Sequence, residues 1–440
     1  MGYLVFTATE PAFGTEIWTS DGTASGTMLF KDITPDETSD LLGNPGGYLP
    51  FGSGFIFSMY LTGVGLSDGT SANTVFNGTP VNAQQFTRIG DKVYFSGLGD
   101  VFDGFEPWVS DGSAAGTFML KNTDASSQNS FPTGFLPLGA KVYFFASSNQ
   151  LWVTDGTMDG TVQVAVDLIR NISAPPVLFD GRIFFSGEID GDGTGAELMV
   201  TDGTIPGTQM LVDINPTGAS APGQFTIAGD TLFFVATDGV HGRELWKTDG
   251  TAAGTTMVKD INPSGTTLFL SRMATSSDGT LYFTAKDDTH GFELWRSDGT
   301  EAGTVMVKDI NEGALSGSAS RITPVGDKVF FTATTPETGT ELWVSDGAEA
   351  GTHLVKDIRE GAASGLEGAL PFAVLGGRVF FEATTDGDGK ELWVSDGSEA
   401  GTVMLADINP GADGSNPTSL AVIGDARVSN GPDVAMLGPE

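Results

Sequence analysis

The stretch that decides the fold is ELWVSDGAEAGTHLVKDI, residues 341–358, which returns almost unchanged as ELWVSDGSEAGTVMLADI at residues 391–408. Its Asp-Gly pair occurs nine times, at intervals of 43 to 50 residues. The Asp residues of these pairs are Asp21, Asp68, Asp111, Asp155, Asp202, Asp249, Asp298, Asp346 and Asp396. Such a period is typical of β-propeller blades. The apolar stripes with a 3.6-residue period that helical repeats need are missing.

Each repeat contains the pattern of four short strands. In residues 320–358, SRITPVG is followed by the apolar run DKVFFTA, by the alternating ELWVS, and, after the turn DGAEAGT, by HLVKDI. Aromatic and β-branched residues bounded by Gly, Asp and Pro are typical of strands. The nearly continuous apolar character of the second strand predicts burial on both faces, between two neighbouring blades.

The two ends of the chain predict how the ring closes. The sequence opens with a second-strand pattern, YLVFTA (3–8), and ends with an extra first strand, TSLAVIGD (418–425). Pairing the two would complete one blade and remove open sheet edges. We therefore predict an all-β, closed propeller of nine four-stranded blades, forming a single domain over residues 1–425, with residues 426–440 as a tail or linker. Eight blades is the alternative, because the second repeat, GVGLSDGT (63–70), lacks both Glu and Trp.

The composition of the chain excludes several classes of function. Lys and Arg number 21 against 56 Asp and Glu, which gives a formal net charge of −35. Such a charge repels nucleic acid and anionic membranes. The absence of Cys excludes disulfides and thiolate chemistry. No apolar run approaches 18 residues, so we expect no transmembrane segment. The opening residues lack a basic region, and we expect no signal peptide in this chain.

Two residue types recur at fixed positions of the repeat. The Trp residues lie three positions before the motif Asp, at Trp18, Trp108, Trp152, Trp246, Trp295, Trp343 and Trp393. The Glu residues lie two positions earlier, at Glu16, Glu106, Glu197, Glu244, Glu293, Glu341 and Glu391. Confinement of every Trp to one position favours packing between blades over sugar stacking. Gln150 replaces the Glu in one repeat, which favours a hydrogen-bonding role over a metal ligand or catalytic acid.

Variation concentrates in the loop before the third strand, as in residues 188–197, 286–293 and 385–391. These loops carry six clustered acids, Asp190, Asp192, Asp287, Asp288, Asp386 and Asp388. Their hard oxygens suit Ca²⁺, although none fits the EF-hand pattern. Two interpretations therefore stay open, a calcium site in at least one loop or ordinary solvated turns.

Two further features of the repeats carry chemistry, a pair of histidines and the VKDI ending. His241 and His290 occupy equivalent places in adjacent repeats, which favours loop histidines inherited by duplication over a zinc site. The VKDI ending, as at Lys259 and Asp260, predicts pairing of charges along the outer strands.

The segments ELWKTDGTAAGTTMVKDI (244–261) and ELWRSDGTEAGTVMVKDI (293–310) resemble the ELWxxDGT repeat of large bacterial surface or secreted proteins. The resemblance covers about 400 of the 440 residues and departs from the pattern in the second and fourth repeats. It implies an exported, repeat-built module with an adhesive or scaffolding role, located outside the cell or at its surface. It provides no catalytic motif.

Three functional hypotheses follow. The first is a non-catalytic extracellular binding or scaffold module, whose variable acidic loops contact a protein or glycan partner, with Ca²⁺ as the one expected cofactor. The second is a glycan-acting hydrolase or lyase with acidic residues in the central funnel. The third is a structural subunit of an extracellular filament or complex. Nucleophile-elbow, zinc-protease and phosphate-loop motifs are absent from the sequence.

Overall fold

The computed structural model describes most of the chain, namely residues 2–33, 45–59, 63–78, 80–99, 104–124, 129–147, 149–164, 168–170, 174–189, 193–263, 271–368 and 371–424. The protein is an all-β propeller of nine antiparallel blades, which confirms the predicted fold class and blade count. The described segments hold one short 3-10 helix, η2 (Glu349–Gly351). Within these segments no helix is long and apolar enough to cross a membrane.

The chain divides into two compact units. The first comprises Met1–Gln163, Ala373–Ser395 and Val403–Glu440, and the second comprises Val164–Phe372 and Asp396–Thr402. We name the blades A to I in the order in which their third strands follow one another along the chain. The prediction of a single domain stays a prediction.

The first unit contains five sheets, and in each the third strand lies between the second and the fourth. Blade A consists of β37 (Thr418–Ile423), β1 (Tyr3–Glu10), β2 (Gly14–Ser20) and β3 (Met28–Lys31). Blade B consists of β4 (Pro45–Phe51), β5 (Gly54–Met59), β6 (Gly63–Ser67) and β7 (Val75–Asn77). Blade C consists of β8 (Val81–Ile89), β9 (Lys92–Leu98), β10 (Phe105–Ser110) and β11 (Phe118–Met119). Blade D consists of β12 (Thr133–Leu138), β13 (Lys141–Ala146), β14 (Gln150–Thr154) and β15 (Val162–Gln163). Blade I consists of β33 (Ala373–Leu375), β34 (Arg378–Thr385), β35 (Gly389–Ser395) and β36 (Val403–Ala406).

The second unit contains four sheets. Blade E consists of β16 (Leu168–Arg170), β17 (Val177–Phe179), β18 (Arg182–Ile189), β19 (Glu197–Thr201) and β20 (Gln209–Val212). Blade F consists of β21 (Gly223–Ala228), β22 (Thr231–Thr237), β23 (Arg243–Thr248) and β24 (Thr256–Lys259). Blade G consists of β25 (Ser271–Thr275), β26 (Leu281–Ala285), β27 (Glu293–Ser297) and β28 (Val305–Lys308). Blade H consists of β29 (Ser320–Val325), β30 (Lys328–Thr335), β31 (Gly339–Ser345) and β32 (His353–Lys356).

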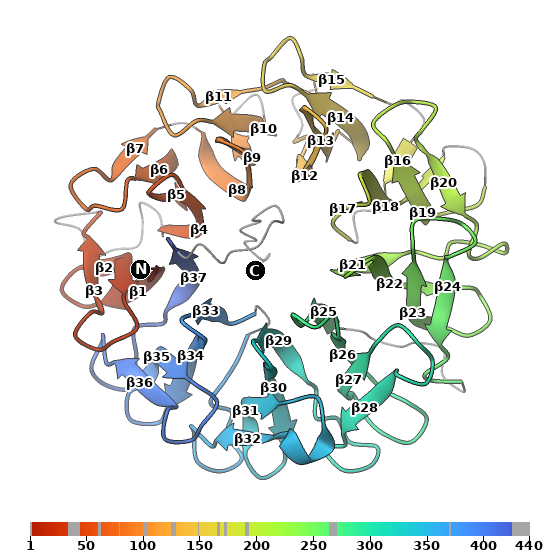
Figure 1. The fold of residues 1–440 in the computed structure, drawn as a ribbon. Helices are drawn as coiled ribbons and strands as arrows, with labels where there is room; N and C mark the ends of the chain where they lie inside the picture. Colours follow the sequence, from red (N-terminus) through yellow and green to blue (C-terminus); the bar gives the residue numbers. More distant parts are fainter. Residues whose placement is uncertain are drawn as a thin grey trace. The chain divides into compact units, whose positions relative to one another are not determined.

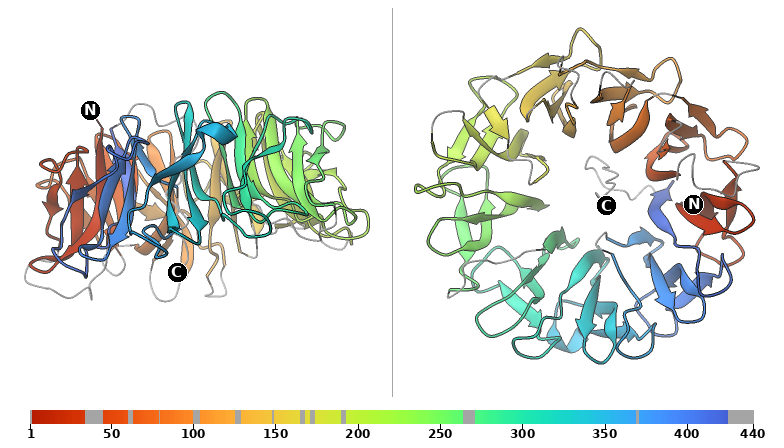
Figure 2. Two further views of the ribbon diagram at one scale, coloured as in Figure 1. Left: turned by 90° about the horizontal axis from the view of Figure 1, so that it is seen from below. Right: turned by 180° about the vertical axis from the view of Figure 1, so that it is seen from behind.

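The predicted closing strand is present. β37 pairs antiparallel with β1, with Tyr3 opposite Ile423 and Leu4 opposite Val422, so the two ends of the chain share blade A (Figure 1). In both views of Figure 2 the blue C-terminal strand runs beside the red N-terminal strands. The strand ends at Ile423, two residues before the predicted limit, because Gly424 adopts a φ of 76°.

Two blades depart from the repeat. In blade E the first strand is divided, since β16 and β17 both pair with β18. In blade B, Gly65 stands where other repeats have Trp, and the ring of Phe57 occupies the space that a side chain at Gly65 would need. Phe57 packs there with Tyr48 and Phe55. An aromatic ring from the second strand thus fills the position of the missing indole.

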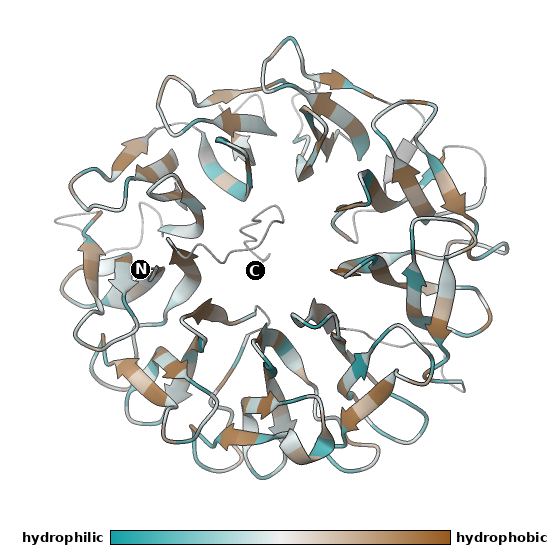
Figure 3. Cartoon of the chain, viewed as in Figure 1, coloured by the Kyte–Doolittle hydropathy of each residue, from teal (hydrophilic) through white to brown (hydrophobic). Residues whose placement is uncertain are grey.

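The core lies between neighbouring blades. Second strands such as β22 are buried along five consecutive residues, so both of their faces are covered, as predicted. Figure 3 shows the hydrophobic residues gathered along the strands. Trp295 of blade G packs with Phe233, Val235 and Leu245 of blade F, and Trp343 of blade H packs with blade G. Burial of these large side chains is the main stabilising contribution.

Candidate functional site

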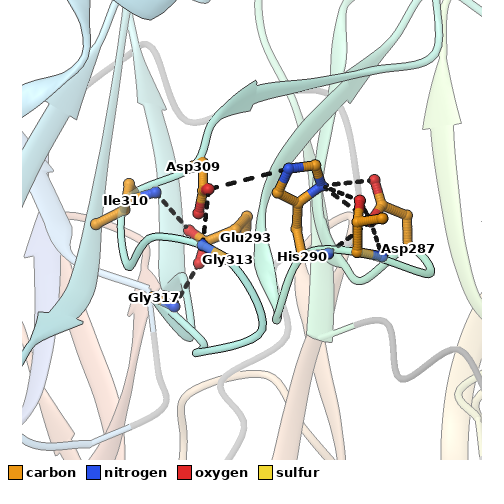
Figure 4. A network of polar contacts seen from close by, with 8 residues as sticks. Asp287, His290, Glu293, Asp309, Ile310, Gly313 and Gly317 are labelled. Carbon is orange, nitrogen blue, oxygen red and sulfur yellow. Dashed lines mark hydrogen bonds and ion pairs between the residues drawn. The ribbon is translucent and has the colours of Figure 1, made fainter.

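The repeated Glu forms an internal clamp in blades E, G, H and I. The side chain of Glu293 is completely buried at the start of β27. Its Oε2 accepts a hydrogen bond from the backbone N–H of Ile310 at 3.1 Å, and its Oε1 accepts one from Gly317 at 2.6 Å (Figure 4). We call this Glu and its two backbone donors the glutamate clamp. It ties the segment that follows the fourth strand back to the third strand.

The clamp recurs with the same spacing. The first bond joins Ile33 to Glu16 at 2.6 Å, Ile214 to Glu197 at 2.9 Å, Ile261 to Glu244 at 3.0 Å, Ile358 to Glu341 at 3.1 Å and Ile408 to Glu391 at 3.2 Å. The second joins Ser220 to Glu197 at 2.7 Å, Gly365 to Glu341 at 2.7 Å and Ser415 to Glu391 at 2.8 Å. The second donors were not among the predicted residues. The sequence signal that marks them is a Gly or Ser about 24 positions after the Glu. Gln150 is half-buried, and its side-chain oxygen accepts a bond from Gln163 at 3.2 Å.

Burial sets the protonation of the clamp. Removal from water raises the pKa of Glu244, Glu293 and Glu341 to about 7, and the nearby Asp260, Asp309 and Asp357 add to the rise. The backbone donors oppose this rise because they stabilise the ionised form. The pKa values of Glu106, Glu197 and Glu391 are also raised, with burial as the first cause.

The Trp side chains contribute apolar surface. Trp295 and Trp343 are buried where neighbouring blades meet, Trp393 is also buried, and Trp108 donates its indole N–H to the carbonyl of Gly97 at 3.0 Å. Within the described residues the buried indole nitrogens of Trp295 and Trp343 have no hydrogen-bond partner. These side chains are therefore placed for packing, with their polar atom away from solvent.

The Asp-Gly turn is an internally bonded loop between the third and fourth strands. Oδ1 of Asp298 accepts bonds from the backbone N–H of Thr300 at 2.8 Å and from its hydroxyl at 2.7 Å. A side chain at Gly303 would overlap the Asp298 carboxylate, which explains the second Gly of the motif. In blade B the equivalent residue is Asn73, whose amide donates to Asp68 at 2.7 Å. These Asp residues serve the turn.

The lysines of the VKDI ending connect neighbouring repeats, which corrects the prediction of charge pairing along the outer strands. Nζ of Lys259 donates to the carbonyl of Thr304 at 2.9 Å, and Nζ of Lys308 donates to that of Thr352 at 3.0 Å. The outer strands are short, so an ammonium group at the strand end reaches the turn of the following repeat. Lys31 makes a comparable bond to Ser71 in the first unit.

The two loop histidines form ion pairs with their own loops. Nδ1 of His290 lies 2.9 Å from Oδ2 of Asp287, and its Nε2 lies 3.9 Å from Oδ2 of Asp309 (Figure 4). Nδ1 of His241 lies 2.6 Å from Asp238. The hydrogen bond to the Asp raises the pKa of each histidine. Burial raises the pKa of Asp287, but the bonds from His290 and Thr289 outweigh it and bring that pKa to about 2.

The six calcium candidates differ in what the structure shows. Asp190 and Asp192 lie outside the described residues. Asp287 accepts bonds from Thr289 and His290, and Asp388 accepts one from the hydroxyl of Thr385 at 3.0 Å. Asp288 and Asp386 also lie in loops before a third strand. Across the described segments no group of three or more His, Asp or Glu side chains is placed to hold a metal ion. The calcium site stays a prediction.

No family model matches the chain, and no curated protein matches it. Similar solved structures include puromycin hydrolase, at 17% identity over 76% of this chain and 54% of that chain with a TM-score of 0.44. They also include BamB from Moraxella catarrhalis, at 15% identity over 77% of this chain and 92% of that chain with a TM-score of 0.44. The chain spans about half the length of puromycin hydrolase. At these identities and TM-scores we base no argument on the similarities. The resemblance to the ELWxxDGT repeat stays an interpretation of the sequence.

Proposed function

We propose that this chain is a non-catalytic binding or scaffold module that acts outside the cell or at its surface. Its rigid blades would present the variable loops before the third strands to a protein or glycan partner. The observation that carries the proposal is that the repeated polar residues serve the framework. Both carboxylate oxygens of Glu293 bind backbone N–H groups, and the Asp298 carboxylate closes a turn.

The variable loops are the part of each repeat that remains available for recognition. Their tips differ strongly between neighbours, since Val240 of blade F is 80% exposed and the equivalent residue of blade G is Thr289. A conserved framework with divergent loops is the arrangement used by binding scaffolds in general. We therefore place the proposed contacts in these loops.

Charge supports a partner that is neutral or cationic. The net charge is −35, which attracts cationic surfaces over a distance of about 10 Å at moderate salt. Several basic side chains are committed to backbone carbonyls: Lys247 bonds to Gly299, Lys259 to Thr304 and Arg182 to Gly250. These bonds to neutral oxygens stabilise the contact between repeats, and Arg182 also lies 3.7 Å from the carboxylate of Asp180. The acidic excess of the surface therefore remains large.

The raised pKa of the clamp does not by itself favour an enzyme. A carboxyl with a pKa of about 7 suits a general acid, but Glu293 is completely buried and both of its oxygens are bonded. A general acid must reach the atom that it protonates. The same shift also occurs at equivalent positions of several blades, as expected of a framework residue.

Binding without turnover tests the proposal. The chain is titrated by calorimetry against neutral oligosaccharides, an acidic polysaccharide and a Lys-rich polypeptide, and each mixture is then analysed for products by mass spectrometry. We expect saturable binding to at least one probe and no product. Cleavage of any probe would overturn the non-catalytic assignment, and failure of every probe to bind would overturn the binding function.

Calcium is part of the same proposal, as the ion that orders one or more acidic loops. If it binds, EDTA lowers the melting temperature and added Ca²⁺ restores it, because a ligand that binds only the folded state stabilises that state. Substituting Asp386→Asn and Asp388→Asn together would abolish the effect if that loop is the site. An unchanged melting temperature in EDTA would eliminate calcium from the proposal.

A further inference from the structure

Phe105 of blade C is half-buried and stacks against an exposed phenylalanine, Phe131. The rings of Phe105 and Phe131 lie nearly parallel, with centroids 5.5 Å apart and an interplanar angle of 20°. Phe105 begins β10, and Phe131 lies in the segment that leads to β12. Phe131 is 58% exposed, although a ring of this size is normally covered by the protein. Phe131, supported by the half-buried ring of Phe105, therefore offers a flat aromatic surface to solvent.

The backbone at Phe131 is unfavourable for such a residue. Its φ is +44°, in the left-handed region that bulky residues rarely adopt. The equivalent position, directly after the second donor of the clamp, holds Ala221, Ser318 and Asn416 in other blades, with φ values of 45°, 50° and 48°. A small or polar residue thus fits this position, and the framework does not require the aromatic ring. Strain of this kind gathers at functional sites.

The glutamate clamp is also incomplete in blade C. Ser130 directs its backbone N–H to the carbonyl of Phe105 at 3.0 Å, and its hydroxyl bonds Oε2 of Glu106 at 3.0 Å. The buried Oε1 of Glu106 has no hydrogen-bond partner among the described residues, although the equivalent oxygens of Glu293 and Glu341 each accept a backbone bond. The framework is therefore altered at the place where the ring of Phe131 is exposed. A buried polar atom without a partner requires an explanation.

We propose that the Phe105–Phe131 pair is a platform on which a neutral sugar ring of a glycan stacks. This inference rests on the proposed binding function and names its surface and the class of ligand. The C–H groups on one face of a pyranose pack against a flat aromatic ring, while the hydroxyl groups at the edge need polar partners. Asn129, which is exposed, carries both a donor and an acceptor, and its oxygen is already fixed by the N–H of Phe105 at 2.9 Å.

The charge of the protein selects a neutral glycan. At a net charge of −35 an acidic polysaccharide is repelled. A Lys-rich protein would be attracted to the carboxylates, whose distribution does not depend on this aromatic pair. A flat aromatic ring beside the exposed amide of Asn129 fits a sugar ring better than it fits the apolar side chains that anchor protein partners in pockets.

The test compares the full chain with three variants against neutral hexasaccharides of glucose, xylose, mannose and N-acetylglucosamine by calorimetry. We expect at least one sugar to bind, Phe131→Ala to weaken it about tenfold or more, and Phe131→Trp to preserve it. Phe76→Ala, which removes a 38% exposed Phe from the outer strand β7 of blade B, is the matched control and should leave the affinity unchanged. Melting temperatures of all variants verify the fold.

The outcomes separate this inference from the function on which it rests. Unchanged affinity in Phe131→Ala, or equal loss in Phe76→Ala, would overturn the platform. If the Lys-rich polypeptide binds and every sugar fails, the binding function stands and the platform falls. If neither kind of probe binds, both are wrong.

Discussion

The backbone N–H of Gly365 donates to Oε1 of Glu341 over 2.7 Å, although the two residues are 24 positions apart in the chain. Glu341 lies in the third strand of blade H, and Gly365 lies in the segment that leaves this blade. One buried side chain thus fixes the path of the chain from the end of one blade. A side chain at Gly365 would overlap the carboxylate in blade H, whereas Ser220 and Ser415 donate from the equivalent positions of blades E and I.

Removing the clamp should destabilise the protein. Glu341→Ala leaves the N–H groups of Ile358 and Gly365 without their acceptor in a buried place, and we expect a loss of about 3 kcal/mol in the free energy of unfolding. Unfolding in urea measures this loss of stability. The control, Glu349→Ala, changes an exposed residue in the turn of the same blade and should stay within about 0.5 kcal/mol. Equal stability of the two variants would contradict the role of the clamp.

The pKa shifts predict how stability depends on pH. Glu244, Glu293 and Glu341 have pKa values raised to about 7, so their contribution is complete below the unfolded value near 4.5 and is lost as pH rises through 7. The raised pKa values of His241 and His290 act in the same direction above pH 6.5. Turn residues such as Asp298 have lowered pKa values, so their protonation destabilises the folded state as pH falls. This opposite effect sets in only below pH 3.8.

We therefore expect the melting temperature to be highest near pH 4.5 and to fall steadily towards pH 8. Glu293→Gln and Glu341→Gln remove ionisable groups and should make the decline between pH 5 and pH 8 less steep. Thermal unfolding followed by circular dichroism across this range measures both effects. A melting temperature that rises from pH 5 to pH 8 would show that the clamp carboxyls are ionised without cost.

The histidine ion pairs predict a titration that NMR can follow. Because Asp287 stabilises the imidazolium of His290 and Asp238 stabilises that of His241, both histidines should titrate above pH 6.5. Asp287→Asn should lower the pKa of His290 and leave that of His241 unchanged. A pKa of His290 that is the same in the variant would show that the contact is absent in solution.

The fold was predictable because its signal is repeated. Nine Asp-Gly turns at nearly equal spacing predict nine blades, and the extra first strand at 418–425 predicts the pairing of β37 with β1. Blade B lacks the Glu and Trp, yet Phe57 fills the space beside Gly65 and the blade still forms. Repetition along the chain thus compensates for one weak repeat.

The candidate site was less predictable because its contacts are not periodic. The VKDI ending predicts charge pairs for its lysines, but the contact of Lys259 with Thr304 joins residues of different repeats. The stacking of Phe131 on Phe105 depends on the path of one connecting segment, which strand patterns do not describe. A large residue where other repeats carry Ala221 or Ser318 is the signal that an alignment of the repeats would have shown.

The turn geometry gives a prediction that a double-mutant cycle can test. A Cβ at Gly303 would overlap the carboxylate of Asp298, which is held by the N–H and hydroxyl of Thr300. Gly303→Ala should therefore cost about 1–3 kcal/mol, because the carboxylate must leave its hydrogen bonds. In an Asp298→Ala background the overlap is gone, and the same substitution should cost much less. Gly387→Ala, in an exposed loop where a Cβ would meet no atom within 4 Å, is the control and should be neutral or slightly stabilising. Strictly additive costs in the cycle would contradict the direct contact between Asp298 and Gly303.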